Sequence, residues 1–302
     1  MVNIDIDESS IESSKRGVFK DGIHYMENEE YHELDGISST NFAIMEKSQA
    51  AFEHRKLFPW KSESFVRGDL WHTAVLEPDK MDKYMEASTT SSDSVSAKKL
   101  AALNPDKTIV GKGSIADAKF IAKGVHTVYH EIFDDNNTRY EVTVLYNSDD
   151  TGMLYKARPD VLFKKPDGTY VIFDLKSTKE ENKESFAYAI EKYNYDLSAA
   201  WYIDTCRLAG IDVVAFGWIC VPISGQRVPY AAIASAENVE IGRQKYNGLL
   251  GDYLEYKSSG VDPRKYEEIF SLSFMRELNK EIERDRVLEK KKELSNDRYS
   301  NN

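Results

Sequence analysis

Residues 157–178, ARPDVLFKKPDGTYVIFDLKST, decide the fold that we expect for this chain. Two runs rich in β-branched and aromatic residues flank the Lys-Pro-Asp-Gly sequence at 165–168, whose proline and glycine suit the corners of a turn. The stretch therefore predicts a β-hairpin. Its second strand carries two charged residues, Asp174 and Lys176, although a strand interior disfavours charges without partners. Either this face of the strand contacts water, or the charges form a site.

The spacing of the charged residues indicates what such a site would contain. Side chains alternate between the two faces of a strand, so Asp174 and Lys176 share one face while Phe173 and Leu175 share the other. The turn brings Asp160, at the start of the hairpin, near Asp174. Two neighbouring carboxylates repel each other unless a proton or a cation lies between them. Oxygen ligands from Asp160 and Asp174, with a backbone carbonyl such as that of Leu175, suit Mg²⁺, for which Mn²⁺ can substitute.

Lys176 is not needed to bind a metal, so its position beside the two aspartates suggests a separate role in the reaction. Beside such a metal, its amine could orient and help to deprotonate a water molecule and could offset charge on a phosphate. These groups together are the parts of a phosphodiesterase site. The alternative is a solvated pair of charges on an exposed strand face, which is common. The combination of Pro-Asp, about a dozen residues and then Asp-x-Lys favours the site.

Composition limits the class of protein. The chain has 302 residues and is 41% hydrophobic, which is enough for one large domain or two small ones. No apolar run approaches the roughly 18 residues of a membrane span. The acidic start, MVNIDIDESS, lacks the features of a signal peptide. With only two cysteines, Cys206 and Cys220, the chain has no four-cysteine metal site, and we expect a cytoplasmic protein.

The net charge of −11 argues at first against a nucleic-acid partner. Residues 1–35, however, hold ten acidic and only three basic side chains, so most of the negative charge lies in this segment. The remaining 267 residues are nearly balanced and can carry a local basic groove. The charge therefore leaves the question of a nucleic-acid partner open.

The pattern along the chain predicts one α/β domain with a central mixed sheet flanked by helices. We expect an acidic flexible arm over 1–35, the domain over 36–275 and a charged tail over 276–302. Helices are expected after a cap at Ser39 or Thr40, within 64–78, after a cap at Ser114, and at 183–192, 196–209 and 236–257. Strands are expected at 139–146, 152–164, 169–177 and 213–222. The polar residues 86–96 are expected to form a mobile loop.

Four stretches of the sequence resemble the PD-(D/E)xK nuclease superfamily and, more closely, the exonuclease domain of the exodeoxyribonuclease VIII (RecE-type) family. The resemblance runs from about residue 37 to residue 260. RGDLWHTAVLEP, at 67–78, resembles the family's Gly-x-x-x-His helix and puts His72 on the histidine that helps to hold metal. KARPD supplies Asp160, and FDLKST supplies Asp174 and Lys176. YNYDLSAAWY, at 193–202, resembles the helix that follows them.

The resemblance implies a restriction-endonuclease-like core and a Mg²⁺-dependent exodeoxyribonuclease. It implies that His72, Asp160 and Asp174 hold the metal and that Lys176 acts beside them, while the Leu175 carbonyl is the further ligand expected from the hairpin. It also implies 5′→3′ degradation of linear double-stranded DNA from its ends, leaving a single-stranded tail for an annealing protein of phage-type recombination. A homo-oligomeric ring around the DNA and a phage or prophage origin within a bacterial host belong to the same expectation.

Several positions keep more than one interpretation. Tyr202 matches the tyrosine of the family's Gln-x-x-x-Tyr helix, but Ser198 stands where the glutamine is expected, and a hydroxyl offers fewer hydrogen bonds than an amide for positioning DNA or water. Arg158 either contacts a phosphate or pairs with a neighbouring carboxylate. His72, among apolar neighbours, could instead be a core histidine. Glu141 is either a further acidic group near the metal or an edge-strand residue that faces water.

Two rival functions remain open at this stage. The first is an endonuclease or flap nuclease on the same fold, because a fold does not specify its substrate. The second is a non-catalytic DNA- or protein-binding module that retains the nuclease fold. The presence together of His72, Asp160, Asp174 and Lys176 speaks against the second, because a scaffold has no need of the lysine.

Overall fold

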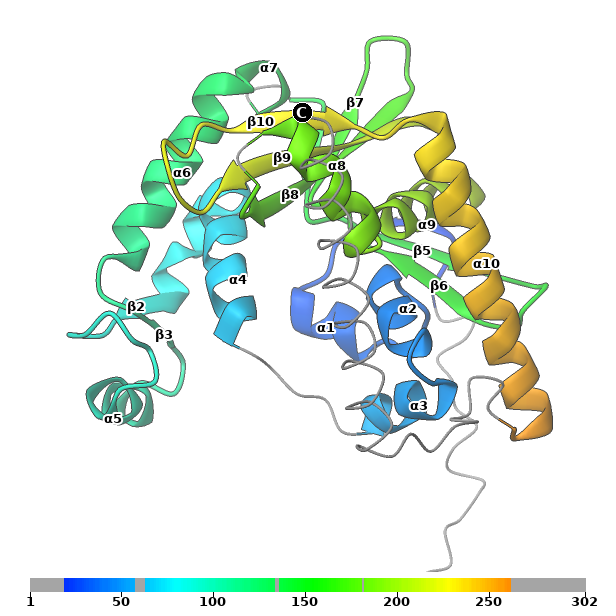
Figure 1. The fold of residues 1–302 in the computed structure, drawn as a ribbon, viewed down its shortest axis with the longest axis horizontal. Coiled ribbons are helices and arrows are strands. Elements are labelled where there is room, and N and C mark those ends of the chain that lie inside the picture. Colours follow the sequence, from blue (N-terminus) through cyan, green and yellow to red (C-terminus); the bar gives the residue numbers. More distant parts are fainter. Residues whose placement is uncertain (1–18, 58–62, 134–135, 181, 262–302) are drawn as a thin grey trace, which may run out of the picture. The chain divides into compact units, whose positions relative to one another are not determined.

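The computed structural model describes residues 19–57, 63–133, 136–180 and 182–261 (Figure 1). The chain divides into two units, residues 1–263 and residues 264–302. The expected charged tail lies in the second unit, outside the described residues. All the elements discussed below belong to the first unit.

The central sheet has five strands in the order β10-β9-β8-β7-β4 (Figure 1). They are β4 (Thr138–Tyr140), β7 (Val161–Lys164), β8 (Tyr170–Thr178), β9 (Val213–Pro222) and β10 (Tyr230–Ile233). β8 and β9 run parallel, and the other neighbouring pairs run antiparallel. β7 and β8 form the hairpin expected from the sequence, with a turn at Lys165–Gly168. The prediction of a central mixed sheet is confirmed.

A second sheet has three strands in the order β1-β5-β6. They are β1 (Gly22–His24), β5 (Thr143–Asn147) and β6 (Leu154–Ala157). Between β4 and β7 the chain passes from one sheet to the other twice, once between β4 and β5 and once between β6 and β7. The continuous strands expected at 139–146 and 152–164 are therefore wrong: each is two strands that belong to different sheets.

Local backbone chemistry explains both breaks. Glu141, after β4, has a φ of 50°, in the left-handed region that a non-glycine residue seldom adopts and that redirects the chain. Pro159, before β7, has no N–H with which to continue a sheet ladder. Alternating hydrophobicity persists through both junctions, so periodicity alone does not reveal them.

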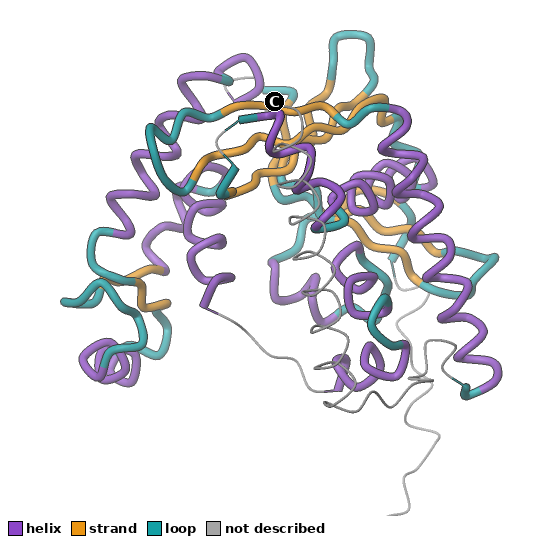
Figure 2. Tube along the Cα trace, viewed as in Figure 1, coloured by secondary structure: helices purple, strands orange, loops and turns teal. Residues whose placement is uncertain are grey.

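Helices cover both faces of the central sheet (Figures 1 and 2). The helices near the start of the chain are α1 (Asn28–Glu33), α2 (Ser39–Met45), α3 (Gln49–Leu57), α4 (Glu63–Leu76) and the 3₁₀ helix Pro78–Lys83, and of these α4 packs on the central sheet. Next come α5 (Val95–Leu103), α6 (Ser114–Val128) and α7 (His130–Phe133). After the hairpin follow α8 (Lys183–Lys192), α9 (Tyr195–Leu208) and α10 (Ala236–Ser259). A small parallel pair, β2 (Tyr84–Glu86) and β3 (Thr108–Val110), lies between the 3₁₀ helix and α6.

The side chains of β8 alternate between two hydrophobic cores, one on each face of the central sheet. Phe173 and Leu175 point to one face, where they pack with residues of α4 and α6. Ile172 points to the other face, where it packs with residues of α8 and α9. Asp174 and Lys176 have the parity of Ile172, so their side chains lie on the α8–α9 face of the strand.

Several boundaries differ from the sequence-based expectation. The helix expected after Ser39 or Thr40 is two helices, α2 and α3, and Ser38 precedes the first; its N–H donates to the Asn41 side chain at 2.7 Å. α6 begins at Ser114, but the residue at its cap position is Gly113. The expected mobile loop over 86–96 ends inside α5.

The acidic segment 1–35 is more structured at its end than expected. Its residues from 19 onward are described, and they include β1 and α1. Tyr31 and Leu34 are buried, and Leu34 packs against Leu145 and Leu154 of the second sheet. Lys156 on β6 donates hydrogen bonds to the carbonyl oxygens of both residues, at 2.9 and 2.8 Å. The end of this segment is therefore part of the fold.

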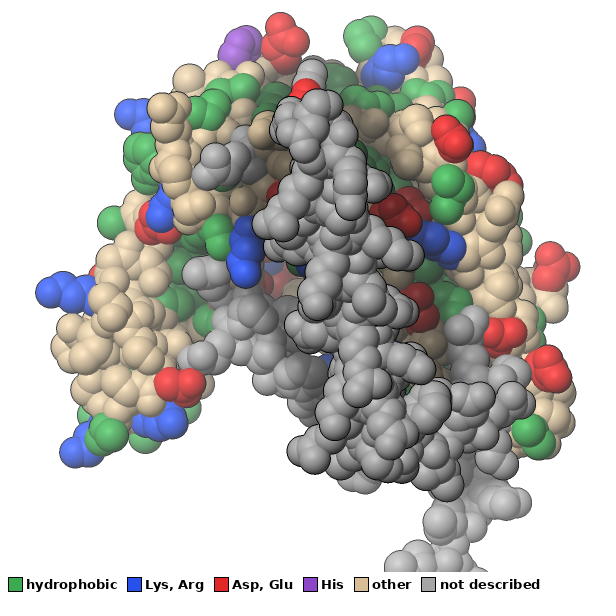
Figure 3. Space-filling model, in the orientation of Figure 1, with side chains coloured by type: hydrophobic (Ala, Val, Ile, Leu, Met, Phe, Trp, Pro, Cys, Tyr) green, Lys and Arg blue, Asp and Glu red, His purple; other side chains and the backbone are tan. Residues whose placement is uncertain are grey.

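The surface seen in Figure 3 carries interspersed acidic and basic side chains among the described residues. Within the same residues, none of the helices combines the length and the apolar character needed to span a lipid bilayer.

Candidate metal centre and active site

The site lies where the chain passes between the two sheets. Glu141 occupies the β4–β5 junction, and its N–H donates to the carbonyl oxygen of Asp160 at 3.1 Å. Asp160 occupies the β6–β7 junction, directly before β7. Because the two crossings lie side by side, they bring two acidic residues that are far apart in sequence to one place.

A possible metal-binding cluster consists of His72, Glu141 and Asp160, which can each offer one ligand atom, all within 4.8 Å of one another. His72 comes from α4, and its Nδ1 lies 3.5 Å from Oδ2 of Asp160. Its Nε2 lies 3.1 Å from the carbonyl oxygen of Leu175 on β8. His72 therefore points at the hairpin, as the resemblance implied, and it is only partly buried.

The two aspartates of the hairpin lie close together and have different partners. Val161 pairs with Phe173 in the β7–β8 register, which brings the preceding Asp160 next to Asp174. Oδ2 of Asp160 accepts a hydrogen bond from the N–H of Leu175 at 2.6 Å. Burial raises the pKa of Asp160, and the negative charge of Asp174 raises it further. A divalent cation would relieve this cost, because it stabilises the charged carboxylate.

Asp174 forms an ion pair with Lys176. Burial by itself would lower the pKa of Lys176, but the charges of Asp174 and Asp160 outweigh it and raise this pKa above its ordinary value. The lysine is therefore held as an ammonium group beside the cluster. Asp174 does not belong to the three-residue cluster, so its role as a metal ligand, like that of the Leu175 carbonyl, stays a prediction.

Arg158 joins the site through Glu141. Its Nε donates to Oε2 of Glu141 at 2.8 Å, and a terminal nitrogen donates to the carbonyl of Met26 and the hydroxyl of Thr143, both at 3.0 Å. Of the two interpretations of Arg158, pairing with a carboxylate is the one observed, and a phosphate contact stays a prediction. Burial raises the pKa of Glu141 to about 7, helped by the charge of Asp160 and opposed by those of His72 and Arg158.

Ser198 and Tyr202 lie four residues apart on α9, so they share a face of this helix. Both side chains are partly buried. Burial raises the pKa of Tyr202 well above its ordinary value, and the nearby charges of Asp174 and Asp160 contribute. Tyr202 is therefore close enough to the aspartates to feel their charge, and a DNA contact by either residue stays a prediction.

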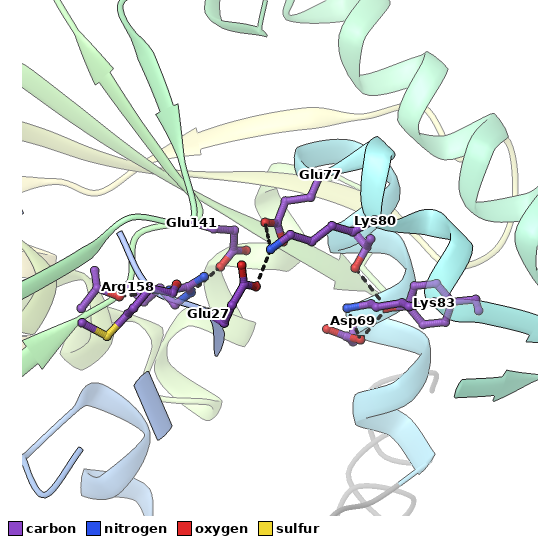
Figure 4. A network of polar contacts seen from close by, with 11 residues as sticks. Glu27, Asp69, Glu77, Lys80, Lys83, Glu141 and Arg158 are labelled. Atoms are coloured by element: carbon purple, nitrogen blue, oxygen red, sulfur yellow. Dashed lines mark hydrogen bonds and ion pairs between the residues drawn. The ribbon is translucent and has the colours of Figure 1, made fainter. Parts of the chain in front are cut away.

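A network of ion pairs borders the site (Figure 4). Nζ of Lys80, on the 3₁₀ helix, lies 2.6 Å from Oε2 of Glu27 and 2.9 Å from Oε1 of Glu77. In Figure 4, Glu27 lies between Lys80 and the Glu141–Arg158 pair. Lys80 lowers the pKa of Glu27 most, and the charge of Arg158 also lowers it. Glu27, which precedes α1, thus places a negative charge at the edge of the site. The sequence pattern had predicted that this residue belongs to a flexible arm.

The donor set is suited to a divalent cation. Two carboxylates could supply oxygen ligands, and one imidazole could supply a nitrogen ligand. Glu141 is the member that the sequence left undecided. Its signal was weak, because a lone glutamate beside a strand is common and only the crossing of the sheets brings it to Asp160.

Residues 38–272 match the model of a family described as a PDDEXK-like domain of unknown function, DUF3799. The chain belongs to this family. The DUF3799 match spans the helices and both sheets from α2 onward, together with all the site residues described above except Glu27. β1 and α1 lie before the matched range.

Among solved structures, the chain is similar to that of a candidate exonuclease from Eubacterium rectale, with a TM-score of 0.54 at 12% sequence identity. The match covers 82% of this chain and 95% of that chain. At this identity the similarity supports the fold alone. The structure of SSO0001 matches with a TM-score of 0.29 and 14% identity over 66% of this chain and 89% of that one, which is too low to carry an argument. No curated protein matches the chain.

These comparisons confirm the PD-(D/E)xK fold expected from the hairpin. They do not test whether the chain is related more closely to the RecE-type enzymes, and this relation stays a hypothesis.

Proposed function

We propose that this protein is a metal-dependent nuclease that hydrolyses phosphodiester bonds in DNA. The observation that carries the proposal is the cluster of His72, Glu141 and Asp160 beside the Asp174–Lys176 ion pair, within a PDDEXK-like domain. A cluster of ligands next to a fixed ammonium group has the parts needed to bind a phosphate and to position a water for attack on it.

His72, Glu141 and Asp160 would hold the metal, with Asp174 as a further candidate ligand. A bound Mg²⁺ supplies charge neutralisation for the phosphate and lowers the pKa of a coordinated water. Arg158 keeps Glu141 in place through the 2.8 Å hydrogen bond from its Nε. The Leu175 N–H does the same for Asp160 through its bond to Oδ2.

Lys176 acts on the reacting groups themselves. As an ammonium group it donates hydrogen bonds to the attacking water and to a non-bridging oxygen of the phosphate. The water oxygen forms a new bond to phosphorus and gives up one proton to bulk solvent, while the bond from phosphorus to one sugar oxygen breaks and that oxygen takes up a proton from solvent. The positive charge of Lys176 offsets the negative charge that grows on the phosphate in this transition state.

We propose further that the enzyme is an exonuclease on linear double-stranded DNA, with 5′→3′ polarity. It would leave a single-stranded tail for an annealing protein and would work as a homo-oligomeric ring around the duplex. The resemblance to the RecE-type family supports these features, and the fold of the candidate exonuclease is consistent with them. Ser198 and Tyr202, on one face of α9, are the residues proposed to contact the DNA.

The test is incubation of the protein with Mg²⁺ and linear duplexes labelled at the 5′ or the 3′ end, with a covalently closed circle as control. Early release of the 5′ label as a mononucleotide, with the circle intact, is the expected result. Cutting of the circle at a comparable rate would favour an endonuclease or flap nuclease on this fold. Binding of DNA without cleavage in Mg²⁺ and in Mn²⁺ would favour a non-catalytic module.

A further inference from the structure

A tyrosine covers the lysine of the site. Nζ of Lys176 lies over the ring of Tyr195, 5.1 Å from its centroid. Tyr195 is the first residue of α9 and does not belong to the Gln-x-x-x-Tyr pattern, whose tyrosine corresponds to Tyr202. Asp174 binds the same ammonium group through an ion pair. The ammonium is therefore held by a carboxylate and by the face of an aromatic ring.

The backbone before α9 gives Tyr195 its position. Asn194, at the cap position, has a φ of 53°, in the left-handed region. Its side chain accepts a hydrogen bond from Lys245 of α10 and donates one to Glu46 after α2, both at 3.1 Å. Lys245 also donates to the buried Asp196 at 2.7 Å. Two elements distant in sequence thus hold the left-handed Asn194 and the first turn of α9 in place.

Neighbouring rings restrict Tyr195 further. Phe186 of α8 stacks on it with ring centroids 5.8 Å apart and an interplanar angle of 29°. The ring of Tyr193 also contacts it, with centroids 5.6 Å apart and an interplanar angle of 36°. With these contacts and a fixed helix start, the ring has little freedom to turn away from Lys176.

We propose that Tyr195 is a positioning residue for Lys176, whose ring face holds the ammonium group in the orientation used in phosphodiester hydrolysis. The role of Lys176 in that hydrolysis rests on the function proposed above. Lysine has a flexible four-carbon stem and three equivalent donors, so an ion pair with Asp174 alone leaves the ammonium free to rotate and shift. An aromatic face attracts the cation without accepting one of its N–H groups, and it excludes water from that side. The remaining N–H groups stay available for the phosphate and the attacking water.

The test compares Tyr195→Phe, which keeps the ring, with Tyr195→Leu and Tyr195→Met, which remove it. Single-turnover cleavage of a linear duplex in Mg²⁺ should stay close to wild type for Tyr195→Phe. For the other two variants it should fall by roughly 5- to 30-fold, the range expected for loss of a partly desolvated cation–π contact. KM for DNA, measured under multiple turnover, should change little, because the role proposed for the ring is to hold Lys176 and not to bind the substrate.

Tyr170, at the start of β8, provides a matched control, because Lys176 lies near the other end of the same strand. Lys164 lies over the ring of Tyr170, 5.9 Å from its centroid, at the start of β8 and away from the site. Tyr170→Leu removes a comparable ring and a comparable contact, and its cleavage rate should equal that of wild type. Melting temperatures of all the variants separate loss of folding from loss of rate.

A second measurement does not depend on cleavage. The Cε protons of Lys176, assigned by comparison with Lys176→Arg, should show an upfield ring-current shift in the NMR spectrum. This shift should persist in Tyr195→Phe and disappear in Tyr195→Met. This measurement tests the contact between Lys176 and Tyr195 whether or not the protein cuts DNA. Failure of the wild-type protein to cut DNA would reject the proposed function and not the contact.

Two outcomes would overturn the proposal while the nuclease assignment stands. One is a wild-type rate for folded Tyr195→Leu or Tyr195→Met when Asp174→Asn is inactive. The other is an equal loss of rate in Tyr195→Phe and Tyr195→Leu, which would assign the effect to the hydroxyl group and not to the ring.

Discussion

Glu141 shows how much a single residue contributes to the site. Its left-handed backbone conformation, with a φ of 50°, turns the chain from one sheet to the other at the point where its carboxylate meets Asp160. A non-glycine residue in this region costs roughly 1–3 kcal/mol, which the surrounding structure must offset. The hydrogen bond from Arg158 and the N–H contact to Asp160 are the interactions that hold it.

Burial of Glu141 predicts a pH-dependent stability of the metal-free protein. Its pKa in the folded protein is raised to about 7 from an ordinary value of 4.5, so the folded state binds this proton more tightly than the unfolded state. Stability from this group is therefore fully present below about pH 4.5 and is lost as the pH rises towards 7. The loss should reach at most about 3 kcal/mol.

Melting temperatures in EDTA at pH 5 and pH 7.5 check this expectation. Wild type should lose more stability over this interval than Glu141→Gln, whose amide still accepts a hydrogen bond from Arg158. Added Mg²⁺ should reduce the difference at pH 7.5, because it stabilises the charged carboxylate. Equal losses in the two proteins would contradict the argument.

Asp174 is the residue with the clearest expected effect on turnover. Asp174→Asn removes the charge that holds Lys176 and a candidate metal ligand, while the amide keeps nearly the same size. DNA cleavage should fall by about a thousandfold or more, which corresponds to several kcal/mol of transition-state stabilisation. Circular dichroism and the melting temperature should show a folded protein. Near-wild-type cleavage by such a protein would reject the assignment of the site.

Among the secondary-structure elements, the contact between α9 and α10 fixes the position of the first turn of α9, which carries Tyr195. Gly242 of α10 lies against the first turn of α9: a Cβ at this position would be 2.1 Å from the carbonyl oxygen of Asp196 and 2.8 Å from the nitrogen of Leu197. Both are backbone atoms, so a larger side chain would force the helices apart.

Gly242→Ala should therefore destabilise the protein by about 1–3 kcal/mol, as overpacking usually does, and should lower the cleavage rate by displacing the start of α9. Gly248 and Gly251 on the same helix are the matched controls, because a Cβ at either position would meet nothing within 4 Å. Gly248→Ala and Gly251→Ala should raise stability by roughly 0.5–1 kcal/mol through helix propensity. The measurement is chemical denaturation, and equal stabilities of the three variants would contradict the close packing.

At the scale of the whole molecule, the proposed ring makes a prediction about mass. An exonuclease that threads DNA through a closed oligomer should have a solution mass several times that of the 34.5 kDa chain. Light scattering coupled to size exclusion measures it directly. A monomer that still degrades linear DNA from its ends would keep the proposed chemistry but reject the ring.

The hairpin and the arrangement of its charges could be predicted from the sequence. Asp174 and Lys176 share a face because strand side chains alternate, and the turn at Lys165–Gly168 brings Asp160 back to them. Both relations depend on neighbours within about twenty residues, where backbone geometry permits few alternatives. The mixed sheet followed from the same local patterns, as did the start of α8 at Lys183 and the end of α9 near Gly210.

The other members of the cluster are brought together by contacts between segments that are distant in sequence. His72 is separated from Leu175 by 103 positions, and the sequence linked them only through the resemblance to a family. Glu141 reaches Asp160 because the chain crosses between two sheets, and the alternating pattern looks the same whether a strand continues or changes sheets. Tyr195 covers Lys176 because α10 and the end of α2 hold the first turn of α9. These contacts depend on packing between distant segments, whose free energies do not appear in any local pattern of residues.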